Sequence, residues 1–205
     1  MKYKIDFSAP ISMCAPAVTG AMIPTSPASK YYAWLPSTWP ATPTNIDSAF
    51  IETLQTIFRD AALGEIKNVI SDIQAQNGDL QHRGHVVGIA IMCALDSIAS
   101  YGYRGHHTAK FIRAHFPPEF HPFADDIYKL YRISLIHQWN LFEATLYPVH
   151  TPIRNDSGTI AFRLLSFFDA LVSGTEDYLD QLSTEPALQQ NTLNRYEELR
   201  KSARP

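Results

Sequence analysis

One run of apolar residues constrains the fold of this chain more than any other feature. The ten residues Val86–Leu95 include no charged side chain, and Asp96 ends the run. A bilayer-spanning helix needs about 20 such residues, so this run is too short to cross a membrane. The surrounding residues predict a helix over about 80–101, and a helix that is apolar on every side must be covered all round. The sequence therefore places this helix at the centre of a bundle.

The other helices are predicted from apolar residues at helical spacing and from caps and prolines. We expect them at about 44–76, 108–116, 123–146, 159–182 and from about 184 to the last residues. Thr44 and Thr184 are the expected caps of the first and last of these helices. No strand alternation or repeat competes with the helical pattern. The predicted fold class is all-α, a helical bundle of about five to six helices.

The first 45 residues differ from the rest of the chain. They hold seven of the 14 prolines, a density that excludes a regular helix. Tyr31–Trp39 nevertheless includes too many large apolar side chains for a free linker. We therefore predict an extended, proline-rich arm over residues 1–45, packed on the helical body or on a second subunit, and a helical domain over residues 46–205.

Composition favours a globular protein of the cytoplasm. Hydrophobic residues make up 45% and charged residues 18% of the chain, and the net charge of −3 gives no overall attraction to nucleic acid. Cys14 and Cys93 are too few for a disulfide framework, and Cys93 lies in the apolar run, where we expect a buried thiol. Asp6, Pro10 and Pro16 interrupt any signal-peptide core, so we expect neither a signal peptide nor a membrane anchor.

The predicted helix over 123–146 has two different faces. One is apolar, whereas the opposite face carries Arg132, Ile133, Ile136, His137 and Asn140. Two isoleucines on a polar face are explained if that face docks against a partner, most simply the same face of a second subunit. Arg132 and His137 are five residues apart, which means about 140° of rotation and about 7.5 Å of rise, so they do not converge within one chain. Two copies across a two-fold axis would bring four such groups to one cleft.

An arginine, then four to six intervening residues and a histidine, near the start of a late helix of a bundle, resembles the hallmark motif of the HEPN superfamily. The setting is also similar, with His82-Arg83-Gly84-His85 opening an apolar helix and Phe116-Pro117-Pro118-Glu119-Phe120 preceding the motif. The resemblance covers about residues 50–200. In that family a polar residue usually follows the arginine, whereas here Ile133 does.

The resemblance implies a dimeric, metal-independent RNA endonuclease without cofactors. His137 would then be the general base toward the ribose 2′-hydroxyl, and Arg132 would hold the scissile phosphate. Asn140 and Ser134, each about one turn from His137, would orient the imidazole or a phosphate oxygen. It also suggests a role in toxin–antitoxin or defence biology, with an antitoxin as a protein partner. The alternative is a non-catalytic dimerisation or partner-binding module that uses Ile133 and Ile136.

Residues near the short helix over 108–116 offer weaker candidates. Arg104, Lys110 and Arg113, together with His106, His107 and His115, form a local basic cluster that suits a phosphate backbone or is simply a solvated helix face. Asp96 is a candidate to anchor one of these basic groups. The histidines at 82 and 85, or those at 106, 107, 115 and 121, lack the partners of a regular metal site, so no metal is expected.

Overall fold

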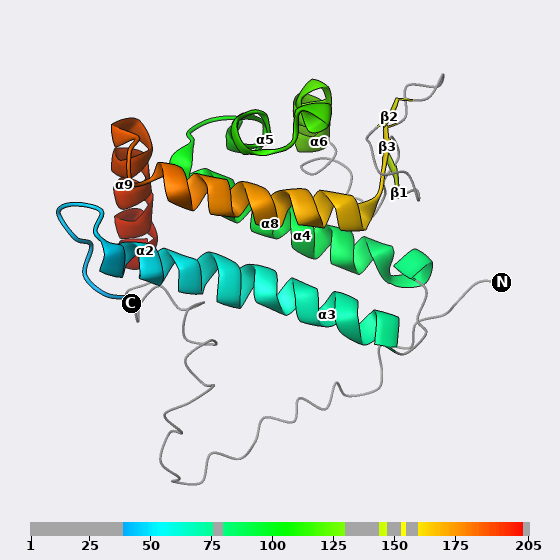
Figure 1. Cartoon of the computed structure of the whole chain (residues 1–205), viewed down its shortest axis with the longest axis horizontal. Coiled ribbons are helices and arrows are strands. Elements are labelled where there is room, and N and C mark those ends of the chain that lie inside the picture. The colour runs from blue at the N-terminus through cyan, green and yellow to red at the C-terminus, as the bar shows by residue number, and fades with distance from the viewer. Residues whose placement is uncertain (1–38, 76–79, 130–143, 147–152, 155–159, 203–205) are drawn as a thin grey trace, which may run out of the picture.

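The computed structural model describes residues 39–75, 80–129, 144–146, 153–154 and 160–202 (Figure 1). Within these residues the chain forms six helical bodies and one small sheet, so the predicted all-α bundle is confirmed. The first body is a single long helix in three consecutive parts. The helical elements are α2 (Ser48–Gln55), η2 (Thr56–Leu63), α3 (Gly64–Ala75), α4 (Leu80–Gly102), α5 (His107–His115), η3 (Pro118–Phe123), α6 (Ala124–Lys129), α8 (Leu164–Gln181) and α9 (Pro186–Ser202).

Helix α4 lies at the centre of the bundle, as its apolar sequence predicts. It packs against α3, α5, α8 and α9, and Figure 1 shows it between the long first helix and α8. Ile91 and Leu95 are fully buried. One stripe of α4 nevertheless faces outward, because Val86 is 57% exposed and Cys93, two turns later, is also exposed. The prediction of a buried Cys93 is therefore wrong, since α4 is covered on most of its sides but not on all.

No single helix in the described ranges is long and apolar enough to cross a membrane. The segments Val86–Gly102 and His107–His115 meet that criterion only as a pair, and the chain bends by 87° between them.

The first helix begins later than predicted. Asp47, not Thr44, is the N-cap, and its Oδ1 accepts a hydrogen bond of 2.8 Å from the Phe50 amide. A carboxylate at this position satisfies a free first-turn amide and also interacts favourably with the helix dipole. The middle part, η2, is a π-helix whose wider turn allows the consecutive residues Ala61, Ala62 and Leu63 all to be buried.

The described residues include three short strands, and two of them replace the predicted ends of two helices. They are β1 (Ala144–Leu146), β2 (Ile153–Arg154) and β3 (Ile160–Phe162), and the sheet order is β1-β3-β2. β1 pairs with β3 in parallel, with Ala144 opposite Ile160, and β2 pairs with β3 antiparallel. The helices predicted over 123–146 and 159–182 are therefore wrong at these ends. Strands of three residues depend on pairing between distant segments, which a helical periodicity cannot reveal.

The segment before α2 packs on the last helix. The Trp39 ring stacks on Tyr196 of α9 with 4.9 Å between centroids, and the Tyr196 hydroxyl donates to the Pro40 carbonyl oxygen at 3.2 Å. Thr42 donates to the Glu197 carboxylate. The described end of the predicted arm thus lies on the helical body of its own chain, while the rest of the arm lies outside the described residues.

Candidate functional site

The residues of the Arg132/His137 motif lie outside the described part of the chain. Helix α6 ends at Lys129 and β1 begins at Ala144, and the motif falls in the stretch between them. The predicted site residues Arg132, Ser134, His137 and Asn140 and the predicted dimer-face residues Ile133 and Ile136 all belong to this stretch. Their roles stay predictions.

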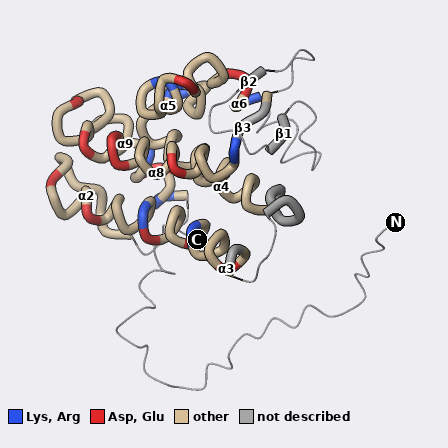
Figure 2. Tube along the Cα trace, turned by 45° about the vertical axis from the view of Figure 1, so that its right-hand side comes forward, with Lys and Arg blue, Asp and Glu red and all other residues tan. Residues whose placement is uncertain are grey.

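Most of the basic cluster around α5 is engaged in contacts within the chain. Arg113 pairs with Asp125 of α6, and Lys110 Nζ donates to the Arg104 carbonyl oxygen at 2.7 Å. Figure 2 shows acidic residues interspersed with the basic ones over the described helices. The guanidinium of Arg104 has no ion-pair or hydrogen-bond partner among the described residues. Of the three predicted RNA-contacting side chains, Arg104 is therefore the one with all its donors available.

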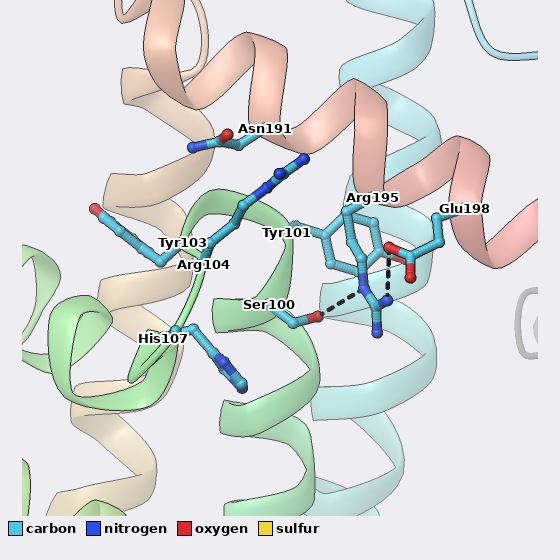
Figure 3. Close-up of a pocket in the computed structure, with 9 residues that line it drawn as sticks. Ser100, Tyr101, Tyr103, Arg104, His107, Asn191, Arg195 and Glu198 are labelled. Atoms are coloured by element: carbon cyan, nitrogen blue, oxygen red, sulfur yellow. Dashed lines mark hydrogen bonds and ion pairs between the residues drawn. The ribbon is translucent and has the colours of Figure 1, made fainter.

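Arg104 borders a cleft of about 530 Å³, which we call the α4–α9 cleft. It lies between the C-terminal end of α4, the loop that joins α4 to α5, and α9 (Figure 3). Two tyrosines, Tyr101 and Tyr103, form its aromatic wall. Its polar side chains are Ser100, Arg104, His107, Asn191, Arg195 and Glu198.

The loop that carries Arg104 has an uncommon backbone. Gly105 and His106 both adopt left-handed conformations, with φ of +51° and +49°, within the turn of 87° after which α5 starts at His107. Glycine adopts such angles without strain, and histidine is one of the few other residues found there regularly. Contact of the His106 ring with Tyr128 of α6, at 5.2 Å between centroids, holds the second of these positions.

Asp96 of α4 fixes the other side of the same loop. Its Oδ1 lies 2.7 Å from His107 Nε2 and accepts a hydrogen bond of 3.0 Å from the Thr108 hydroxyl. Asp96 thus anchors a basic group of the cluster, as the sequence suggested. One carboxylate thereby joins α4 to the first turn of α5, and the direction in which α5 leaves the loop is set.

The α9 side of the cleft is held by two side chains one helical turn apart. Asn191 Nδ2 donates to the Gly102 carbonyl oxygen at 2.9 Å. Arg195 Nε donates to the Ser100 hydroxyl at 3.2 Å, and its Nη1 lies 3.0 Å from Glu198 Oε2. Because the guanidinium has five N–H donors, three of them remain after these two contacts.

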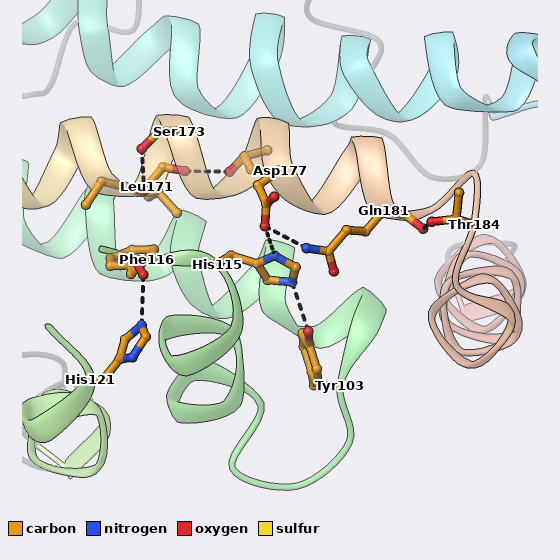
Figure 4. Close-up of polar contacts among 11 residues, drawn as sticks. Tyr103, His115, Phe116, His121, Leu171, Ser173, Asp177, Gln181 and Thr184 are labelled. Atoms are coloured by element: carbon orange, nitrogen blue, oxygen red, sulfur yellow. Dashed lines mark hydrogen bonds and ion pairs between the residues drawn. The ribbon is translucent and has the colours of Figure 1, made fainter. Parts of the chain in front are cut away.

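Behind the Tyr103 wall lies a polar chain of three side chains (Figure 4). The Tyr103 hydroxyl lies 2.8 Å from His115 Nε2, and His115 Nδ1 lies 2.6 Å from Asp177 Oδ2. Burial lowers the pKa of His115, and the hydrogen bond with Asp177 opposes this only in part. A neutral imidazole that donates from Nδ1 to Asp177 and accepts at Nε2 from the Tyr103 hydroxyl satisfies all three groups.

This order of groups superficially matches a nucleophile, a base and an orienting carboxylate. Burial raises the pKa of Tyr103 to about 12, so its hydroxyl stays protonated at neutral pH. The His115 side chain is fully buried, and both of its ring nitrogens are occupied. The chain Tyr103–His115–Asp177 is therefore a structural link that holds α5 and the cleft wall against α8.

The histidines near α5 do not converge on one point. His107 and His115 bond to different carboxylates, and His121 Nε2 donates to the Phe116 carbonyl oxygen at 2.8 Å. Among the described residues no group of three or more His, Cys, Asp or Glu side chains is arranged to hold a metal ion. The side chains of His82 and His85 are outside the description.

Sequence reasoning missed the α9 half of the cleft. Asn191, Arg195 and Glu198 follow each other at intervals of four and three residues, which places them on one helix face. That spacing was a usable signal for a polar face. It did not indicate which helix this face meets, because the contact joins α9 to the end of α4 across about 90 residues of sequence.

Comparison with known proteins identifies no relative that would assign a function. The chain matches no protein-family model, no curated protein and no solved structure.

Proposed function

We propose that this protein is a metal-independent RNA endonuclease that acts as a dimer. The observation that carries the proposal is the spacing of Arg132 and His137 in a chain whose described body is an all-helical bundle. Both features agree with the resemblance to HEPN proteins. Helix α6 ends at Lys129, which precedes Arg132 by three residues in the sequence.

In the proposed reaction His137 removes the proton from a ribose 2′-hydroxyl, and the oxygen attacks the adjacent phosphorus. A histidine suits this step because its usual pKa lies near neutral pH. Arg132 holds the phosphate and stabilises the negative charge that builds on its oxygens. The P–O5′ bond breaks, the departing O5′ takes up a proton from water, and the products are a 2′,3′-cyclic phosphate and a 5′-hydroxyl. Asn140 and Ser134 orient the imidazole or a phosphate oxygen.

Cleavage of RNA by the purified protein in the presence of EDTA tests the proposal. We expect the wild type to cut and Arg132→Ala and His137→Ala to lose at least about 100-fold in rate, the usual scale for a general base or a charge-stabilising donor. Arg59→Ala is the matched control, because Arg59 pairs with Glu176 of α8 and belongs neither to the motif nor to the basic cluster around α5. Cleavage that survives both motif substitutions contradicts the proposal. If all variants are folded and equally silent, the proposal is also wrong, and the partner-binding alternative remains.

A mixing experiment tests whether the site is shared between subunits. Arg132→Ala and His137→Ala proteins are unfolded together, refolded and assayed. If each site takes Arg132 from one chain and His137 from the other, a mixed dimer has one intact site. Half of the dimers are then mixed and each has one of two sites, so we expect about a quarter of wild-type activity. Recovery of no activity, while the separate wild type refolds to full activity, argues against the composite site.

A further inference from the structure

The described residues that line the α4–α9 cleft are separate in sequence from the Arg132/His137 motif. Its volume of about 530 Å³ falls within the range of small-molecule sites, roughly 300–1,000 Å³. The Arg132/His137 proposal gives it no role.

Two guanidinium groups reach this cleft from different elements. Arg104 extends from the α4–α5 loop toward α9, whereas Arg195 extends from α9 toward Ser100 (Figure 3). Glu198 is the acidic side chain at the cleft, and it is 64% exposed at the rim, where water screens its charge. The cleft therefore retains a net positive charge, and Ser100 and Glu198 hold one of its two arginines in place.

The arrangement favours a phosphate over a carboxylate. A planar carboxylate is satisfied by the parallel N–H groups of a single guanidinium. A terminal phosphate has three oxygens arranged around one atom and carries more charge, so it uses donors that arrive from two directions. The ring of Tyr103 provides a flat, half-buried wall beside these donors for the rest of the ligand.

We propose that the α4–α9 cleft binds the terminal phosphate of a nucleotide-sized ligand through Arg104 and Arg195. The phosphate belongs either to a free mononucleotide or to the 5′ end of an oligonucleotide, and these two sources share the same chemistry. Tyr103 then packs against the sugar or base. The structural link to His115 and Asp177 fixes that ring before the ligand arrives, so little side-chain freedom is lost on binding.

Calorimetric titration of the full-length protein with AMP, adenosine and inorganic phosphate tests the proposal. We expect AMP to bind and inorganic phosphate to bind more weakly than AMP. Adenosine, which lacks the phosphate, should bind at least about tenfold more weakly than AMP, because one charge-assisted contact contributes about tenfold in affinity. Arg104→Gln is expected to weaken AMP binding by about tenfold or more. Arg113→Gln is the matched control, because this substitution removes the same charge from the same region of the protein. Arg113 pairs with Asp125 of α6 and does not line the cleft.

A short DNA oligonucleotide with and without a 5′-phosphate separates the two sources of the phosphate. Preference for the phosphorylated oligonucleotide over AMP indicates a nucleic-acid end, and the reverse indicates a free nucleotide. Neither AMP nor DNA carries the bond that the proposed endonuclease would cut, so these results are independent of RNA cleavage. Equal binding of AMP and adenosine, equal weakening by Arg104→Gln and Arg113→Gln, or no AMP binding at millimolar concentration each overturns the proposal.

Discussion

Replacing Gly102 by alanine tests the packing that forms the cleft. Gly102 is the last residue of α4 and faces Tyr178 of α8 and Leu188 of α9. A Cβ atom there would lie 2.7 Å from Tyr178 Cε2 and 3.2 Å from Leu188 Cδ2. Carbon atoms in ordinary contact are about 3.5–4.0 Å apart, so the ring of Tyr178 would have to shift by close to 1 Å.

The Tyr178 ring has little room for such a shift. It is fully buried, its hydroxyl lies 2.5 Å from the Thr192 hydroxyl, and its ring contacts Phe58 and Phe111. Overpacking of this kind costs about 1–3 kcal/mol. The alanine gains at most about 1 kcal/mol in helix propensity, and less at the end of a helix. We therefore expect a net loss of about 1–2 kcal/mol, which corresponds to a fall in Tm of about 2–8 °C for a protein of this size.

Gly88→Ala is the matched control in the same helix. A Cβ atom at Gly88 would meet Leu164 Cδ1 at 3.8 Å, an ordinary contact, and Gly88 lies in the interior of α4. We expect a gain of about 0.5–1 kcal/mol there. Thermal unfolding followed by circular dichroism measures both variants. If Gly102→Ala is as stable as the wild type, or if both variants lose stability equally, the argument from steric contact is refuted.

Two further predictions concern pH. Burial lowers the pKa of His115 below its usual 6.5, so the unfolded chain takes up the proton at a higher pH than the folded chain. The contribution of neutral His115 to stability is therefore complete above pH 6.5 and is lost as the pH falls through the folded-state pKa. Denaturant unfolding between pH 7.5 and 5 should show a steeper loss for the wild type than for His115→Gln, by at most about 1.4 kcal/mol per pH unit, and parallel curves would contradict it. Arg200, with a smaller effect from Thr42, lowers the pKa of Glu197 to about 2, so its interactions persist above about pH 4.5 and are lost as the pH falls toward 2. NMR titration should show this pKa rising more in Arg200→Met than in Thr42→Val, and the reverse order would refute the assignment.

The sequence predicted the parts of the fold that depend on local pattern and on burial. The apolar run of α4 correctly predicted the central helix, and the predicted helices over about 80–101 and 108–116 agree closely with the observed bounds of α4 and α5. Both signals are local. A helix that is covered on most sides needs a continuous apolar run, and the sharp turn between α4 and α5 needs residues that tolerate a left-handed backbone. Burial of single residues on such a helix was less accessible, as Cys93 shows, because it depends on which stripe the neighbouring helices leave uncovered.

The features that sequence reasoning missed depend on contacts between distant segments. Pairing of β1 with β3 joins residues 144–146 to 160–162, and the helical periodicity of each segment hid it. In the same way, Asn191 and Arg195 contact the end of α4, about 90 residues away in sequence, and no local pattern on the last helix indicates these contacts. His115 was placed in the basic cluster because its position on α5 gave no sign that its side chain is buried and bonded to Asp177 of α8.

The loop that carries Arg104 packs on helix α6. His106 and His107, which follow Arg104 in the cleft loop, both place their rings against Tyr128 of α6, at 5.2 and 6.4 Å between centroids. Tyr128 is the penultimate residue of α6 and precedes Arg132 by four residues in the sequence. Asp96 fixes the same loop from the opposite side, so the loop packs on α6 from a defined position. A substitution at Tyr128 therefore disturbs the packing of the cleft loop as a whole, whereas Arg104→Gln changes a single side chain of that loop, and that difference makes Arg104→Gln the sharper test of the cleft.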